Sequence, residues 1–242
     1  MRCRGLTAAA FRKLDMQRIA EIVRKTNETD ISLRLNIDGR GLTQFHYPIG
    51  FMVHMLNTFA RHGLYDLDIT ASGDLEVDQH HLVEDTGIVL GQCFARALGE
   101  KRGIRRNGSC LFPMDETLAR AAVDISGRPF LYFDGQLSDA PLLASCGSDK
   151  NTPCNGAPLQ GEPFYFQTST IEDFWQAFTG AAGCALHLEI LRGRSDHHKI
   201  EALFKAAARA LRAACEIDAR ASDSIPSTKG TLNTPEIPGI TA

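Results

Sequence analysis

The chain has 242 residues and a formal net charge of −3 at neutral pH; 43% of its residues are hydrophobic and 23% are charged. This is the composition of an ordinary globular protein, and it gives no reason to expect nucleic acid or an anionic membrane as a partner. No apolar run approaches the roughly 20 residues that span a bilayer. The seven cysteines form no CxxC motif, which is typical of reduced thiols in a cytoplasmic protein.

The beginning of the chain is basic and then amphipathic, and it lacks the continuous apolar core of a secretory signal. An organelle-targeting segment over residues 1–13 is the weaker alternative, because Asp15 and Glu21 soon interrupt the pattern. We divide the chain into an N-terminal extension (residues 1–20), two halves (21–112 and 113–233) and a flexible tail (234–242).

Hydrophobic periodicity predicts the following elements in chain order. They are extended structure over 19–36, a helix over 52–62 stopped by Gly63, a strand over 67–77, a helix over 80–98 stopped by Gly99, strand material over 121–133, a helix over 170–182, a strand over 185–191 and a helix over 197–215. Residues 138–161 are rich in Ser, Pro, Gly and Asn, and this composition predicts an inserted mobile loop.

The second half repeats the first in the order helix, strand, helix, which indicates an internal duplication. Each half then forms one sheet with helices on one side. The expected fold is an α/β (α+β) sandwich in which the helices pack between two sheets.

The motif HHxxE occurs twice, as His80-His81-Leu82-Val83-Glu84 and as His197-His198-Lys199-Ile200-Glu201. On a helix the glutamate shares a face with the histidines three or four residues earlier. Adjacent side chains point about 100° apart, so one pair is better placed to serve two ions than to grip one. A single HH pair is more often plain surface or core histidine; the repeat favours two metal sites, each drawing a ligand from both motifs.

Two further histidines, His54 and His187, lie upstream of the two motifs. The predicted metal ligands are His54, His80, His81, Glu84, His187, His197, His198 and Glu201, which divide into two sites of three histidines and one glutamate. Imidazole with carboxylate suits Mn, Fe, Ni, Co or Zn, and four such ligands leave about two positions open on an octahedral ion. A zinc hydrolase is a weaker reading, because HHxxE is not the HExxH motif of zinc proteases. His46 and His62 are interpreted as structural or solvated.

Further short stretches carry a resemblance to a known family. They are Arg24-Lys25-Thr26-Asn27-Glu28-Thr29, His54-Met55-Leu56, Gly73-Asp74-Leu75-Glu76-Val77-Asp78, Pro113-Met114-Asp115-Glu116, Asp124-Ile125-Ser126-Gly127-Arg128-Pro129 and Ile225-Pro226-Ser227-Thr228-Lys229-Gly230. Together with the two HHxxE motifs, residues 22–232 resemble the imidazoleglycerol-phosphate dehydratase family of histidine biosynthesis.

The resemblance implies a carbon–oxygen lyase that dehydrates D-erythro-imidazole-glycerol phosphate to imidazole-acetol phosphate. It also implies two Mn²⁺ ions per active site and a homo-oligomer, a 24-subunit shell with metal sites at subunit contacts. Glu28 would move the proton, with Glu84, Glu201 and Lys205 beside the reacting centre. Arg106, Arg128, Ser227 and Lys229 would hold the substrate phosphate. Asp115 and Glu116 are interpreted as helix caps.

Several positions depart from the family pattern. Val53 and Gln79 stand where Asp is usual, Leu82 replaces a usual Thr, and Ser195 replaces a usual Asn. We expect a working but divergent dehydratase with retuned metal sites. The alternatives are a paralogue that dehydrates another small phosphate ester and a metal-binding assembly without turnover.

Overall fold

The structure, a computed structural model, describes residues 18–138, 142–144 and 164–232. The predicted targeting segment, most of the inserted loop and the predicted flexible tail lie outside these ranges. Within the described ranges, no helix combines the length and the apolar composition that crossing a membrane requires.

The first half forms a four-stranded sheet with two helices. Its elements are β1 (Ile19–Lys25), β2 (Thr29–Asn36), β3 (Thr43–His46), α2 (Gly50–Gly63), β4 (Asp66–Gly73) and α3 (His80–Leu98). The strand order is β1-β2-β4-β3, and β3 runs parallel to β4.

The second half has the same arrangement. Its elements are β5 (Asn107–Met114), β6 (Thr117–Asp124), β7 (Phe130–Asp134), α4 (Thr170–Ala182), β10 (Ala185–Arg192) and α5 (Asp196–Cys215). The order β5-β6-β10-β7, with β7 parallel to β10, matches that of the first sheet strand for strand. A small hairpin of β8 (Leu142–Ala144) and β9 (Phe164–Phe166) lies between β7 and α4. The predicted duplication and the predicted sandwich are thereby confirmed.

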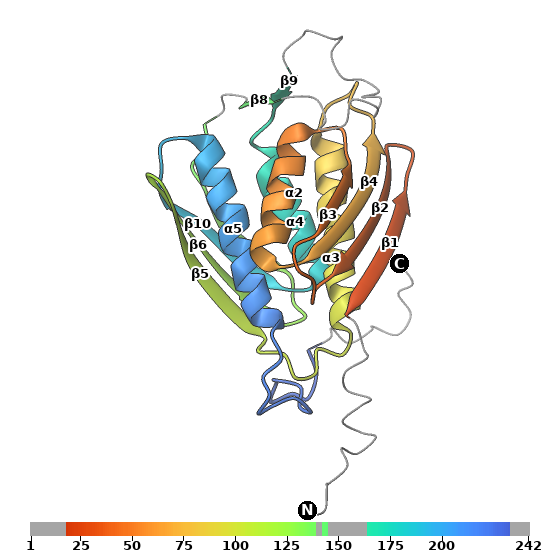
Figure 1. The fold of residues 1–242 in the computed structure, drawn as a ribbon, viewed down its shortest axis with the longest axis vertical. Helices are drawn as coiled ribbons and strands as arrows, with labels where there is room; N and C mark the ends of the chain where they lie inside the picture. The colour runs from red at the N-terminus through yellow and green to blue at the C-terminus, as the bar shows by residue number, and fades with distance from the viewer. Residues whose placement is uncertain (1–17, 139–141, 145–163, 233–242) are drawn as a thin grey trace, which may run out of the picture.

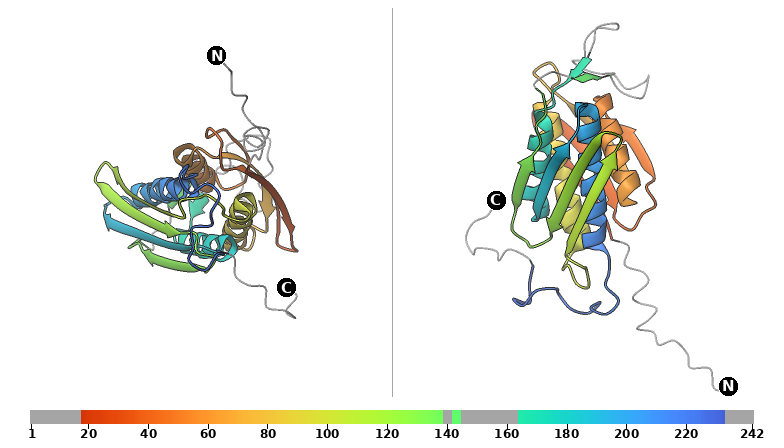
Figure 2. Two further views of the ribbon diagram at one scale, coloured as in Figure 1. Left: turned by 90° about the horizontal axis from the view of Figure 1, so that it is seen from below. Right: turned by 90° about the vertical axis from the view of Figure 1, so that its left-hand side faces the viewer.

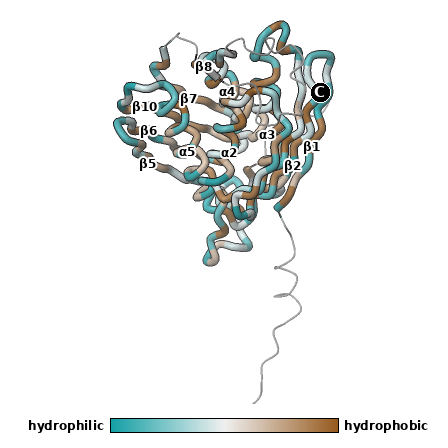
Figure 3. Tube along the Cα trace, turned by 45° about the horizontal axis from the view of Figure 1, so that its top comes forward, coloured by the Kyte–Doolittle hydropathy of each residue, from teal (hydrophilic) through white to brown (hydrophobic). Residues whose placement is uncertain are grey.

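The four helices form a layer between the two sheets (Figure 1 and Figure 2). Apolar and polar residues alternate along the strands (Figure 3), so one face of each sheet turns toward the helices. On β2 the buried positions are Ile31, Leu33 and Leu35. In the helix layer, α2 packs against α5 of the other half, and α4 packs against α3. Each half therefore completes its core with a helix from the other.

Four strands were not predicted: β3, β5, and the hairpin strands β8 and β9, of which β8 falls within the predicted mobile loop. β3 has only four residues, which is too few to establish a period. β5 contains Gly108 and Pro113, which ordinarily break a strand. Because β5 is the edge strand of its sheet, Pro113 needs no ladder partner on its open side.

The predicted stop at Gly63 needs a small correction. Gly63 is the last residue of α2, and Leu64 takes the left-handed conformation that ends the helix, at φ 57°. A side chain at Gly63 would overlap the ring of buried Tyr65. Gly63 is thus required for packing, whereas the left-handed turn falls on its neighbour.

The close approach of α3 and α4 makes Gly91→Ala a destabilising change. A Cβ at Gly91 would lie 2.5 Å from the carbonyl oxygen of Phe178, which is backbone and cannot rotate away. Overpacking of this kind costs about 1–3 kcal/mol, and for a chain of this size we expect a melting temperature lower by roughly 2–10 °C. Gly180→Ala on α4 is the matched control, because no atom would lie within 4 Å of its Cβ. Equal melting temperatures for the two variants would refute the packing argument.

Candidate active site

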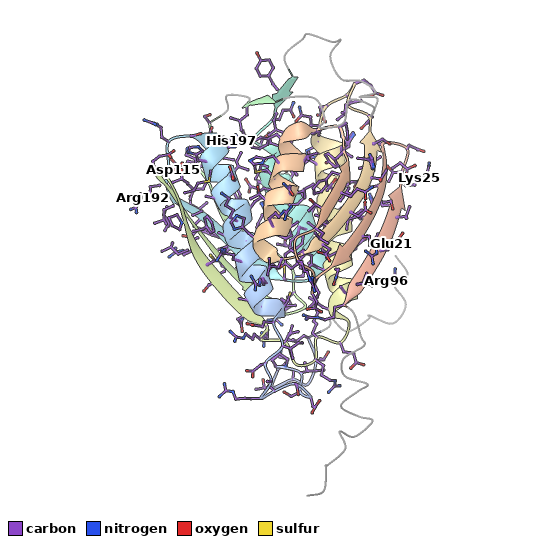
Figure 4. All side chains as sticks on the ribbon, viewed as in Figure 1. Glu21, Lys25, Arg96, Asp115, Arg192 and His197 are labelled. Atoms are coloured by element: carbon purple, nitrogen blue, oxygen red, sulfur yellow. The ribbon has the colours of Figure 1, made fainter. Side chains whose placement is uncertain are left out.

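Both HHxxE motifs open long helices at the same end of the sandwich. α3 begins at His80, and α5 begins at Asp196, one residue before His197. Figure 4 shows His197 and Asp115 together at that end, where α5 begins and the β5–β6 hairpin turns. Ser195 caps α5, since its hydroxyl accepts the backbone N–H of His198 at 3.5 Å. The helical reading of both motifs is confirmed.

One cluster joins His54 of α2 to His197 and Glu201 of α5. The Nε2 atoms of both histidines lie 3.3 Å from the same oxygen, Oε2 of Glu201. The other oxygen of Glu201 accepts from Nζ of Lys205 at 2.8 Å. Burial works to raise the pKa of Glu201, but Lys205 and His54 outweigh it and the pKa is lowered. The cluster therefore presents two imidazoles and an anionic carboxylate to one point, as a metal ion requires.

A second cluster forms around His80. Its Nε2 lies 3.5 Å from Glu84, and its Nδ1 lies 3.2 Å from the carboxylate of Asp173 on α4. A carboxylate on the second ring nitrogen commonly fixes the orientation of a metal-binding histidine. Asp173 was not predicted. The duplication contains the signal, because Asp173 lies near the start of α4 as His54 lies near the start of α2.

The second histidine of each motif points to other carboxylates. Nδ1 of His81 lies 3.0 Å from Asp74 and 3.9 Å from Glu28, and the hydrogen bond to Asp74 raises the pKa of His81. Nδ1 of His198 lies 2.9 Å from Glu116. Neighbouring histidines of one motif thus face different partners, in keeping with two ions rather than one.

Glu116 does not cap a helix in the expected way. With Asp115 it lies in the hairpin turn between β5 and β6, and its side chain accepts backbone N–H groups of Ser195 and Arg194 at 3.1 and 3.3 Å. These contacts fasten the hairpin to the segment before α5. The hydrogen bond with His198 is the largest cause that lowers the pKa of Glu116 to about 2.

His187 joins neither cluster. It points from the outer face of its sheet, with ring centroids 5.7 Å from Phe130 and from Tyr132, and lines a hollow with Ser109 and Ala122. The predicted division into three histidines and one glutamate per site is therefore not formed among the described residues of one chain. An ion bound by His187 would have to draw its other ligands from a second copy.

The predicted phosphate set lies at the opposite end of the sandwich. The backbone N–H of Arg106 donates to the carbonyl of Ala214, near the end of α5, at 2.9 Å. At about 1.5 Å per residue, the stretch of α5 from His197 to Ala214 is roughly 25 Å long. Arg128 follows β6, which is antiparallel to β5, so it lies at the same end as Arg106.

Around Arg106 the set is partly assembled. Its guanidinium binds both oxygens of Asp124, at 2.7 and 2.9 Å, and the carbonyl of Pro226 at 3.0 Å. The Pro226 contact brings the next residue, Ser227, to this end of the sheet, and the hydroxyl of Ser227 accepts the N–H of Lys229 at 3.1 Å. One chain thus brings its two histidine–carboxylate clusters to one end and its phosphate-type donors to the other, where His187 also lies, opposite Ala122 in the sheet register.

The profile of the imidazoleglycerol-phosphate dehydratase family matches residues 47–211. The chain belongs to this family. The imidazoleglycerol-phosphate dehydratase of Acinetobacter baumannii (strain AYE) is 47% identical over 89% of this chain and 96% of its own. That of Thermoanaerobacter pseudethanolicus is 49% identical over 89% of this chain and its own full length.

Solved structures agree with this membership. The imidazoleglycerol-phosphate dehydratase of Staphylococcus aureus subsp. aureus N315 is similar with a TM-score of 0.65 and 34% identity, covering 83% of this chain and 99% of its own. The Pyrococcus furiosus protein, solved in complex with (S)-C348, gives a TM-score of 0.65 and 31% identity. The chain is therefore a hydro-lyase, a carbon–oxygen lyase, by family.

Two departures from the family pattern have a packing role. Val53 of α2 packs against the core, and Leu82 is fully buried and lies against Gly73. Ser195 keeps a polar function as the cap of α5. None of these three side chains takes a ligand away from the two clusters of this dehydratase.

Proposed function

We propose that this dehydratase converts D-erythro-imidazole-glycerol phosphate to imidazole-acetol phosphate in histidine biosynthesis, with two Mn²⁺ ions per active site. The observation that carries the proposal is the pair of histidine–carboxylate clusters at the starts of α3 and α5 in a chain of this family. We also propose the cytoplasm as its place of action, in keeping with cysteines that form no CxxC motif.

The donor set fits a metal such as Mn²⁺. The ligand atoms of His54, His197 and Glu201 all lie within 4.8 Å of one another, and imidazole with carboxylate is the set that such ions accept. His80 and Glu84 would hold the second ion. His81 and His198, whose Nδ1 atoms pair with Asp74 and Glu116, would complete either site through Nε2. When bound, the ions supply Lewis-acid polarisation and a template for the substrate.

The chain's own residues perform the remaining tasks. Glu28 is half-exposed beside His81, so its carboxylate can take the proton from substrate carbon. Lys205 holds Oε1 of Glu201 and leaves Oε2 turned to the two histidines. Arg106, Arg128, Ser227 and Lys229 supply positive charge and N–H or O–H donors for the phosphate.

The two ends of the sandwich cannot bind one substrate molecule within a single copy. The clusters and the phosphate set lie roughly 25 Å apart along α5, much farther than a phosphorylated three-carbon chain with an imidazole can reach. We infer that the active site forms between copies, one presenting the two histidine–carboxylate clusters and another the phosphate donors. This supports a homo-oligomer; its form as a 24-subunit shell rests on the family resemblance.

Turnover of imidazole-glycerol phosphate by the purified full-length protein tests the proposal. With Mn²⁺ bound, we expect imidazole-acetol phosphate to form, the rate to vanish on chelation and Mn²⁺ to restore it. Bound Mn²⁺ without this product would refute the assignment. Dehydration of another phosphate ester would then identify a divergent paralogue, and no turnover of any would indicate a non-catalytic assembly.

A further inference from the structure

Gln79, the residue before the first HH pair, is buried and binds the chain where it leaves the inserted loop. The residue is 6% exposed. Its side-chain Nε2 donates to the carbonyl of Tyr165, and its Oε1 accepts the backbone N–H of Gln167 at 3.3 Å. The side-chain amide of Gln79 thus forms the donor and acceptor contacts that a neighbouring strand would form. This contact occupies the position where the family pattern has Asp.

Asp196, the residue before the second HH pair, holds the chain entering the same loop. It is 8% exposed. Its Oδ2 accepts both the backbone N–H and the hydroxyl of Ser138, and its Oδ1 accepts Nζ of Lys199 at 2.9 Å. Lys199 also donates to the carbonyl of Gln136 at 2.8 Å. A buried carboxylate is costly unless it is satisfied in this way.

The segment that Gln79 binds and the segment that Asp196 binds are also joined to each other. The hydroxyl of Thr168 donates to the carbonyl of Ser138 at 3.0 Å. Phe166, two residues before Thr168, is fully buried and packs on Phe51, with ring centroids 4.7 Å apart. Phe51 in turn contacts the ring of His197 edge-on, at 5.4 Å between centroids. A path of hydrogen bonds therefore runs from Gln79 through the loop's two ends to Asp196.

We propose that Gln79 and Asp196 are positioning residues that use the ends of the inserted loop as a brace between the first turns of α3 and α5. The brace fixes the His80–Glu84 cluster relative to the His197–Glu201 cluster, and hence the placement of the two ions. The inference rests on the proposed metal sites, but not on which substrate they serve.

Equilibrium binding of Mn²⁺ to the full-length assembly, followed by electron paramagnetic resonance of the free ion, tests the brace. In Gln79→Ala we expect affinity for the bound ions to fall by about 10–100-fold, as when an orienting partner of a ligand is lost. Gln79→Glu keeps the volume and one acceptor but removes the donor to Tyr165. It should therefore also weaken Mn²⁺ binding. Gln167→Ala is the matched control, because its backbone, not its exposed side chain, makes the contact.

A double-mutant cycle separates a brace from two independent loop anchors. If the path acts as one unit, Gln79→Ala combined with Asp196→Asn should weaken Mn²⁺ binding by clearly less than the product of the single effects. Additive losses, or a lower melting temperature with unchanged Mn²⁺ affinity, would overturn the proposal. Wild-type protein that binds Mn²⁺ but does not dehydrate imidazole-glycerol phosphate would remove the proposed substrate and leave this binding test intact.

Discussion

Glu201→Gln is expected to remove one Mn²⁺ per chain and to lower kcat/KM for imidazole-glycerol phosphate by at least about 100-fold, the upper end of what losing an outer partner of a ligand costs. Oε2 of Glu201 is the atom on which His54 and His197 converge, each at 3.3 Å. A neutral amide keeps the shape but loses the negative charge that balances the cation. Metal analysis of the purified variant, alongside turnover, gives the measurement.

Glu189→Gln provides the control for this change. Glu189 pairs with Arg120 on the outer face of the second sheet, away from the helix layer, and makes no contact with either cluster. Its metal content and kcat/KM should match those of the wild type. A Glu201→Gln protein that still carries two ions per active site would show that Glu201 is not a ligand.

The second large effect concerns mixed assemblies. Glu201→Gln chains and Lys229→Ala chains, each poorly active alone, should regain turnover when they are dissociated and reassembled together. The reason is that roughly 25 Å of α5 separates the histidine–carboxylate clusters from the phosphate donors. Two copies are therefore needed to build one site. Lys229 is exposed, and losing a charge-assisted contact to phosphate costs roughly 1.5–3 kcal/mol. Turnover of the reassembled mixture is compared with that of each parent.

Mixing the two parents without dissociation is the control, and it should give no gain. A double variant, Glu201→Gln with Lys229→Ala on one chain, reassembled with itself should remain inactive. If verified mixed assemblies are no more active than their parents, each chain contains its own complete site and the shared-site inference is wrong.

The sequence predicted what depends on local periodicity. The bounds of α3 and α4 came from apolar spacing and from Gly99. His54 was predicted because it lies upstream of the first motif, and the spacing of buried Met52, Met55 and Leu56 accounts for its place on α2. Ligands spaced four apart on a helix share a face whatever the rest of the fold does.

The remainder depends on which elements meet. The pairing of α4 with α3 brings Asp173 to His80, and only the internal duplication, not the residues around Asp173, indicates it. For His187 the sequence held an unused signal, because buried Leu186 and Leu188 on either side place it on the opposite face of the strand. The contacts of Gln79 are with backbone atoms, which carry no residue-specific pattern at all.

The exchange of helices between the halves has a consequence for the origin of the chain. His54 comes from the first half and meets Glu201 of the second, while Asp173 of the second half meets His80 of the first. A protein of half this length could have formed such clusters only as a dimer, with two identical copies of each. If the two halves descend from one such ancestor, histidine near the start of α2 and aspartate near the start of α4 are a place where they have since diverged.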